Sequence, residues 1–380
     1  MADPHPPGTK QRHPGTGALL LTLLVLTAGT HQRPLDAQEP GAADRALYQA
    51  ACANCHGVDG TGALASAVAF EEELPDFSSC TFASREPDAD WAAVVHDGGP
   101  VRGFSRMMPA FGDALTDDEI LRVLGYVRSF CGDDAWPPGE LNLPRPLVTE
   151  KAYPEDEAVL STTASVEGAG VVMSRLVYER RFGARNQVEF VLPFGAREQT
   201  GGGWAAGVGD FAVGIKRALV HSLSSGTIVS VTGEVVLPTG LEDEGFGKGT
   251  MVLEPFLTLG QILPSDGFLQ VQAGVEIPLE RAAADDEAFA RIALGKSFTQ
   301  GRFGRTWSPM VEVLAARELI DGARMQWALL PQMQVTLNTR QHIMVNAGVR
   351  IPLTDAATTP TEVLFYVLWD WFDGGLFAGW

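Results

Sequence analysis

The second half of the chain alternates between apolar and polar residues over unusually long segments. The alternation is strongest in residues 226–239, 268–279, 325–337 and 341–352. A period of two predicts β-strands with one apolar and one polar face. Strands of globular proteins usually have about 5–6 residues, whereas a tilted strand that crosses a bilayer needs about 9–11. The pattern therefore predicts strands of membrane-spanning length.

The connections between these strands alternate between long and short. Long polar or glycine-rich loops are expected at 195–206, 239–249, 280–287 and 353–361, and tight turns at 223–226, 264–267 and 338–340. Long loops on one side and short turns on the other are typical of outer-membrane barrels, which have an even number of strands in bacteria. Counting in this way predicts about twelve antiparallel strands, with both ends of the barrel on the short-turn, periplasmic side.

A water-soluble β-sandwich or lipocalin-like barrel is the alternative, with the apolar faces inside. Strand length, aromatic residues near the last strand and polar faces rich in Gln, Ser and Thr favour the membrane barrel. Its lumen would then be lined by charged residues that form a salt-bridged plug, set an ion preference or simply satisfy one another. These residues are Glu189, Glu234, Glu254, Glu276, Glu312, Lys216, Arg291 and Arg350. The pattern resembles that of small outer-membrane transporter or porin barrels, and the terminal Trp380 resembles their insertion signal.

The first half has a different construction. Apolar residues at helical spacing follow Thr116, and Glu119 completes a capping box, so a helix is expected from about residue 117. Further upstream, Lys10 and Arg12 precede an apolar run at 19–28, which predicts a secretory signal, with an uncleaved anchor as the alternative. The expected divisions are a signal peptide at 1–38, a helical domain at 39–132, a proline-rich linker at 133–157 and the barrel at 158–380.

Charge and cysteine usage narrow the possible functions. The formal net charge of −19 argues against nucleic-acid binding, which requires a basic surface. All four cysteines lie in the first half, at Cys52, Cys55, Cys80 and Cys131. This asymmetry supports two segments of different construction.

The string Cys52-Ala-Asn-Cys55-His56 is the attachment motif of a c-type haem. The spacing lets both thiols join the two vinyl groups of haem and leaves His56 beneath the iron as an axial ligand. A thioredoxin-like redox pair or half of a zinc site are the alternatives. A zinc site would need a second Cys or His pair at ligand spacing, and none is obvious.

Residues 43–131 resemble the class I monohaem cytochromes c. The haem motif follows a first helix with Tyr48, a glycine-rich loop comes after His56, and Tyr126 lies on the last helix, where the family's two terminal helices cross. The resemblance implies that Met108, directly before a proline, is the distal ligand, with Met107 as the competitor. His96 is a further possible ligand.

Cys80 and Cys131 remain after the haem motif is assigned. In an exported protein two spare thiols are expected to form a disulfide, and two buried free thiols are the alternative.

A haem iron with His and Met ligands has no open position, which favours electron transfer over catalysis. We therefore expect one covalent haem c in an electron carrier, with periplasmic redox proteins and the outer membrane as partners. The domain would face the periplasm and be held at the membrane by the barrel. The alternatives are a transporter or porin with a redox-sensing or gating haem domain, and a soluble periplasmic two-domain carrier.

Overall fold

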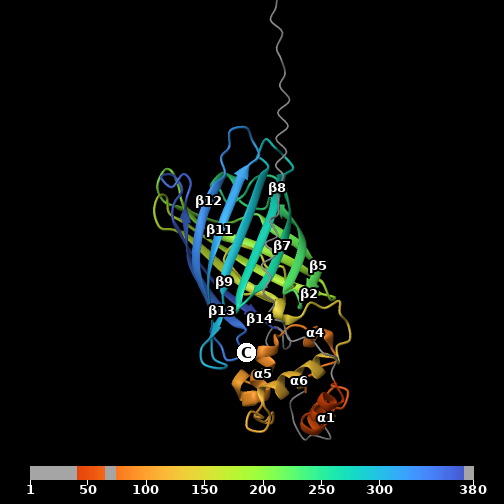
Figure 1. Cartoon of the computed structure of the whole chain (residues 1–380). Coiled ribbons are helices and arrows are strands. Elements are labelled where there is room, and N and C mark those ends of the chain that lie inside the picture. The colour runs from red at the N-terminus through yellow and green to blue at the C-terminus, as the bar shows by residue number, and fades with distance from the viewer. Residues whose placement is uncertain (1–40, 65–73, 372–380) are drawn as a thin grey trace, which may run out of the picture. The chain divides into compact units, whose positions relative to one another are not determined.

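The computed structural model describes residues 41–64 and 74–371 (Figure 1). The predicted signal peptide and the C-terminal aromatic residues 372–380 lie outside the described residues. The helical elements are α1 (Ala42–Ala51), α2 (Ala53–His56), α4 (Cys80–Ala83), α5 (Asp88–Asp97), η1 (Gly99–Arg102), α6 (Asp117–Arg128), η2 (Gly139–Leu141) and η3 (Glu242–Glu244). The strands are β1 (Glu157–Ser165), β2 (Val171–Phe182), β3 (Asn186–Glu198), β4 (Trp204–Val208), β5 (Phe211–Ser222), β6 (Thr227–Leu237), β7 (Val252–Leu263), β8 (Gly267–Pro278), β9 (Glu287–Lys296), β10 (Phe298–Thr299), β11 (Thr306–Glu318), β12 (Gln326–Thr336), β13 (Ile343–Pro352) and β14 (Glu362–Asp370).

The strands form a closed antiparallel barrel. The order runs from β11 through β14, β1, β2, β3 and β5 to β9, and β9 pairs with β11 to complete the circle. The first and last barrel strands pair directly, with Glu157 opposite Asp370. Strands β4 and β10 are short additions, so the barrel has twelve strands and the predicted number is confirmed. In Figure 1 the long strands run side by side around the barrel.

The two faces of the barrel wall are inverted relative to a water-soluble protein. Outward side chains are large and apolar, such as Ile215 and Leu257, which are 58% and 54% exposed. Inward side chains are polar, such as Gln187 and Ser230, which are fully buried. A continuous apolar exterior around a polar interior is the arrangement of a membrane barrel, so the polar faces line the lumen as expected.

The N-terminal helices form a small domain around an aromatic core. The rings of Tyr48 on α1 and Tyr126 on α6 lie 5.3 Å apart between centroids, and Phe130 packs against both. Helix α6 begins with the predicted capping box, in which the Thr116 backbone N–H donates to the Glu119 carboxylate over 2.9 Å. No helix in the described part of the chain is long and apolar enough to cross a bilayer.

Much of the segment expected as a linker is buried inside the barrel. We call residues 141–156 the lumen segment. Its hydrogen bonds and ion pairs reach side chains of β1, β2, β3, β6, β8, β9, β11, β12, β13 and β14. A segment that contacts strands around most of a closed barrel must lie within it. This proline-rich segment therefore fills part of the lumen and is not an exposed connector.

The lumen segment is not a strand, so its backbone N–H and C=O groups have no neighbouring strand to pair with. Side chains of the barrel wall bond to these groups instead. The amides of Gln332 and Gln272 accept from the backbone N–H groups of Leu147 and Glu150 over 2.9 and 3.0 Å. The Gln270 amide donates to the Pro144 carbonyl over 2.7 Å. Buried backbone groups require such partners, so the glutamines of the inner wall and the lumen segment stabilise one another.

Candidate functional site

The haem-motif residues lie on one helical turn. Helix α1 leads into Cys52, and helix α2 carries Cys55 and His56. The backbone N–H groups of Cys55 and His56 both donate to the Cys52 carbonyl, over 3.1 and 3.0 Å. Residues three apart on a helix share a face, so the two thiols lie on the same side of the turn, and the imidazole follows directly.

Two aromatic side chains fix this turn. The Tyr48 hydroxyl donates to the Gly57 carbonyl over 2.7 Å, immediately after the motif. Gly57 ends α2 at a φ of 75°, a conformation that favours glycine. The Phe77 ring lies 4.9 Å from the His56 ring between centroids. The turn is thus attached to the core of the domain on both sides.

Burial controls the protonation of the motif. It raises the pKa of the Cys52 thiol to about 11, with a smaller contribution from the neighbouring Cys55. Burial also lowers the pKa of His56, so the imidazole is neutral at neutral pH. The neutral imidazole is the form that coordinates a metal. The protein therefore presents a protonated Cys52 thiol and a neutral His56 imidazole on this turn.

The donor set fits a covalently attached haem. Cys52 and Cys55 are free thiols, although their spacing is also that of redox disulfides. Within the described residues the buried Nδ1 of His56 has no hydrogen-bond partner. Two free thiols and a half-buried imidazole on one turn match the two thioethers and the axial nitrogen that haem c requires.

The candidate distal ligands lie on the loop between α5 and α6. Met108 is half-buried and its backbone is held at both ends, because its N–H donates to the Ser105 carbonyl and its carbonyl accepts from Gly99. Met107 is 56% exposed. His96, in the last turn of α5, places Nδ1 2.5 Å from the Asp97 carboxylate.

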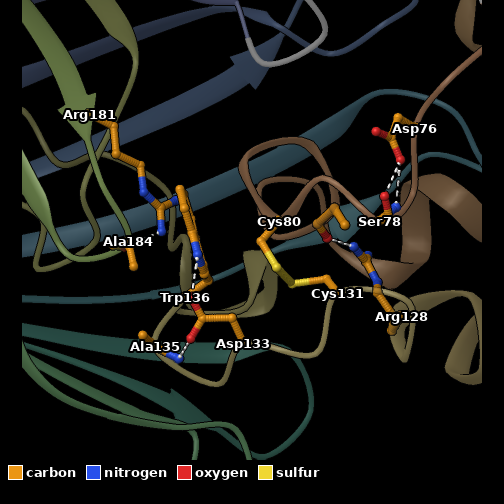
Figure 2. The surroundings of a disulfide bond; sticks show 11 residues. Asp76, Ser78, Cys80, Arg128, Cys131, Asp133, Ala135, Trp136, Arg181 and Ala184 are labelled. Atoms are coloured by element: carbon orange, nitrogen blue, oxygen red, sulfur yellow. Dashed lines mark hydrogen bonds between the residues drawn. A yellow bond between two sulfur atoms is a disulfide. The ribbon is translucent and has the colours of Figure 1, made fainter. Parts of the chain in front are cut away.

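A disulfide joins Cys80 at the start of α4 to Cys131 just after α6 (Figure 2). The two Cα atoms are 5.0 Å apart and the residues are separated by 51 positions. Arg128 reinforces the same junction, because its guanidinium donates to the Ala83 carbonyl in α4 and lies 3.8 Å from the Trp91 ring centroid in α5. Figure 2 also shows Trp136, whose indole N–H donates to Asp133, beside the Arg181 side chain of β2.

Arg145 forms the polar centre of the lumen segment. Its guanidinium donates to Glu157 of β1 and, over 2.9 Å, to Glu179 of β2. It also lies 3.2 Å from Glu150 within the segment. An arginine guanidinium stays protonated throughout the pH range of folded proteins, and the three carboxylates around Arg145 compensate its charge in the buried lumen. This arginine is therefore a permanent buried cation.

Ion pairs also join the helical domain to the barrel end. The Arg85 guanidinium lies 2.8 Å from the Asp156 carboxylate, directly before β1. Nε2 of His342, directly before β13, lies 2.8 Å from the Glu86 carboxylate. Both barrel residues are at the short-turn end of their strands. These contacts attach the helical domain to the end of the barrel that carries the short turns.

The sequence predicts the haem motif but not the residues that surround it in the folded domain. Phe77 and Arg128 carry no motif, and their roles depend on the folded arrangement of α4, α5 and α6. The prolines around Arg145 predict a semi-rigid connector, so its buried place in the lumen was not expected. The signal that could have indicated a packed role is the number of charged residues of both signs close together in one proline-rich segment, at Arg145, Glu150, Lys151, Glu155 and Asp156.

Fold and site together define a two-domain protein, in which a helical haem-binding domain precedes a barrel of the outer-membrane type. Residues 40–127 match the family model of cytochrome c oxidase, cbb3-type, subunit III, and so form a cytochrome c domain. A comparison with curated proteins gives no match.

Among solved structures, similar chains include an outer membrane channel from Pseudomonas putida F1, with 14% identity and a TM-score of 0.43, covering 60% of this chain and 100% of that one. The NanC porin has 8% identity and a TM-score of 0.40, covering 56% of this chain and 98% of that one. The KdgM porin has 8% identity and a TM-score of 0.38, covering 57% and 99%.

Proposed function

We propose that the protein transfers electrons through one covalently bound haem c, in a periplasmic domain that the barrel anchors to the outer membrane. The observation that carries this proposal is the single turn with two free thiols and a neutral imidazole, at Cys52, Cys55 and His56. The cytochrome c family match over residues 40–127 supports it.

Each site residue has a defined task. Cys52 and Cys55 would hold the group as thioethers, and His56 and Met108 would bind its iron. The haem supplies one-electron exchange between its ferric and ferrous states. Tyr48 and Phe77 keep the proximal turn rigid, and the backbone contacts of Met108 keep its loop in place. With His56 and Met108 both binding the iron, these residues would favour electron transfer over a reaction at the iron.

The anchoring role follows from the barrel wall. Its apolar exterior requires an apolar environment, which an outer membrane provides. In such barrels the short turns face the periplasm. The pairs of Arg85 with Asp156 and Glu86 with His342 lie at that end. The cytochrome domain would therefore meet donors and acceptors in the periplasm.

Covalent attachment is tested on a denaturing gel stained for haem. We expect the purified full chain to keep its haem stain after boiling, because thioethers survive denaturation. The variant Cys52→Ser/Cys55→Ser should lose all of the stain. The variant Cys80→Ser/Cys131→Ser is the matched control, since it also removes two thiols but leaves the motif intact. Equal staining of both variants would contradict the attachment site.

Electron transfer itself is tested by mixing the reduced protein with an oxidised soluble c-type cytochrome and following both absorption bands. We expect oxidation of the haem in step with reduction of the acceptor. A haem that is reducible but exchanges no electrons with such an acceptor would contradict the proposed function.

Location and orientation are tested in cells that carry the protein. We expect the haem-stained band to fractionate with the outer membrane and to migrate faster without boiling, as folded barrels do. Added protease should remove the haem-stained domain only after the outer membrane is permeabilised. Cleavage of that domain in intact cells would place it on the outside, and recovery in the soluble periplasm would contradict the anchor.

A further inference from the structure

Six inward glutamates form a continuous row across neighbouring strands of the barrel, which we call the acidic row. Its members are Glu179, Glu189, Glu234, Glu254, Glu276 and Glu287. Each lies on the same face of its strand as the buried lumen side chains. The row therefore faces the lumen.

The register of the strands aligns the first four members. Glu179 of β2 is directly opposite Glu189 of β3. Glu189 and Glu234 are both opposite Gly214 of β5, and Glu234 is in turn opposite Glu254 of β7. A Cβ at Gly214 would lie 3.6 Å from the Glu189 Cβ and 3.8 Å from Glu234 Oε2, so the two glutamates border the same space.

The row continues to the opposite end of the barrel. Leu253 of β7 is opposite Ile277 of β8, and Glu254 and Glu276 come next to this pair on the same side. Glu276 is in turn opposite Glu287 of β9. Glu287 is the first residue of β9, after the long loop 279–286, whereas Glu179 lies near the short turn that follows β2. Since barrel strands are tilted, a row across them climbs along the barrel axis. The acidic row thus runs through most of the length of the lumen.

Such a row opposes folding unless cations accompany it, because like charges on facing strand positions repel. Apart from Arg145 of the lumen segment, the described cations whose charge acts on the row are Arg175, Lys216, Lys248 and Arg291. Of these, Lys248 forms an ion pair with Glu276. Counted in their ionised forms, the six carboxylates of the row outnumber these four cations along this path.

A cation from the lumen segment occupies the short-turn end of the row. The Arg145 guanidinium bridges Glu157 and Glu179, all three being buried. The second carboxylate oxygen of Glu179, Oε1, is buried without a hydrogen-bond partner among the described residues. Arg145 belongs to the lumen segment rather than to the wall. The row therefore already holds a positively charged group where the lumen is filled.

We propose that the barrel is a pore for small cations that the lumen segment closes, with Arg145 in the position of a permeating ion. The acidic row is the path of the cations, and the lumen segment blocks it by filling the short-turn half of the lumen. This activity is separate from the proposed electron transfer, because no residue of the haem site takes part in it.

The test is conductance of the full chain in planar bilayers. The key variant replaces residues 144–152 with an equally long Gly/Ser sequence, which removes Arg145 and the segment's anchors. We expect no channel events from the native protein and open channels from the variant. We expect K⁺ to be preferred over Cl⁻ on the order of tenfold, measured from the reversal potential in a KCl gradient. The variant Arg217→Ser, at an exposed arginine on the outward face, is the control and should stay closed.

The acidic row is tested in the opened protein. Adding Glu234→Gln, Glu254→Gln and Glu276→Gln should reduce the K⁺ preference to about onefold, whereas Glu244→Gln in the loop after β6 should leave the preference unchanged. Folding of every variant is checked by heat-modifiable migration. If the Gly/Ser variant does not fold, Arg145→Ala takes its place and should produce intermittent openings.

Three results would overturn the proposal. The native protein conducting as well as the folded variant would show that the segment closes nothing. A folded variant that stays silent would show that the lumen is no pore. An open variant without cation preference would exclude the acidic row as the path. None of these results touches the haem stain or electron exchange, so the proposed function is judged separately.

Discussion

The variant Met108→Ala is expected to lose the sulfur-to-iron charge-transfer band of the oxidised protein completely. It should also have a lower reduction potential, because thioether ligation favours the ferrous state. The haem should stay covalently attached, since Cys52, Cys55 and His56 are unchanged. The measurements are the oxidised absorption spectrum and a redox titration of the purified full chain.

The structure explains why Met108 rather than Met107 should give this result. Met108 is half-buried, with its carbonyl 3.0 Å from the Gly99 N–H and its N–H 3.2 Å from the Ser105 carbonyl. Gly98, at a φ of 82°, lets the chain approach Met108 closely, because a Cβ there would lie 3.0 Å from the Met108 carbonyl oxygen. Met107 points largely to solvent. The Met107 backbone N–H donates to the Ser105 hydroxyl over 3.3 Å, whereas Met108 is held through both its N–H and its carbonyl and is the more buried of the two.

Met107→Ala is the matched control, since it removes a thioether one position away. Its spectrum and potential should equal those of the native protein. Loss of the band in Met107→Ala with retention in Met108→Ala would reverse the assignment. Loss in neither would point to another distal ligand, and His96 would be the next residue to replace.

The second large effect is expected from Arg145→Met. The change leaves Glu157 and Glu179 buried in the lumen without their shared cation. Removing one partner of a buried ion pair costs about 3–5 kcal/mol, and methionine has a similar length, so the loss is one of charge rather than of volume. The free energy of unfolding, measured by urea titration in detergent with heat-modifiable migration as the readout, should fall by this amount.

Arg180→Met is the control for a more exposed arginine. Arg180 pairs with Asp156 at 3.1 Å, but its own side chain is 50% exposed. Solvent screens such a pair, so a loss of no more than about 1 kcal/mol is expected. Equal losses in the two variants would show that the Arg145 cluster contributes no more than an ordinary surface pair.

Periodicity and loop lengths were sufficient to predict the architecture. The alternation in β6, β8 and β13 indicated which face of each strand is apolar, and the contrast between long loops and short turns indicated twelve strands. Both signals depend only on residues that are close together in the chain, so they can be read from a single sequence. The haem motif is local too, because its chemistry needs three side chains within five positions.

The lumen segment could not be predicted in the same way. Its burial depends on partners far away in the chain, such as Gln332, Glu312 and Gln187. Buried Lys151 and Asp156 look like surface residues in a sequence, since hydrophobic patterning treats every charge as exposed. The prolines also suggested an exposed linker. In the structure they belong to a buried segment whose backbone forms hydrogen bonds with side chains of the barrel wall.

The sequence predicted members of the acidic row but not their alignment. Glu189, Glu234, Glu254 and Glu276 were expected to line the lumen, because the polar face of each strand is set by its own alternation. Their alignment depends on cross-strand register, which periodicity does not contain. A shift of a single strand by two residues would keep every glutamate inward and yet break the row.

The pairing of β1 with β14 has a consequence for how the protein is assembled. The lumen segment directly precedes β1, so it is present when the first strand forms, and the seam with β14 can only close around it. Its backbone partners on β11, β12 and β13 belong to the last strands to be made. In the native chain the seam between β1 and β14 therefore closes around a filled lumen, and the segment stabilises the last strands through the contacts that it makes with them.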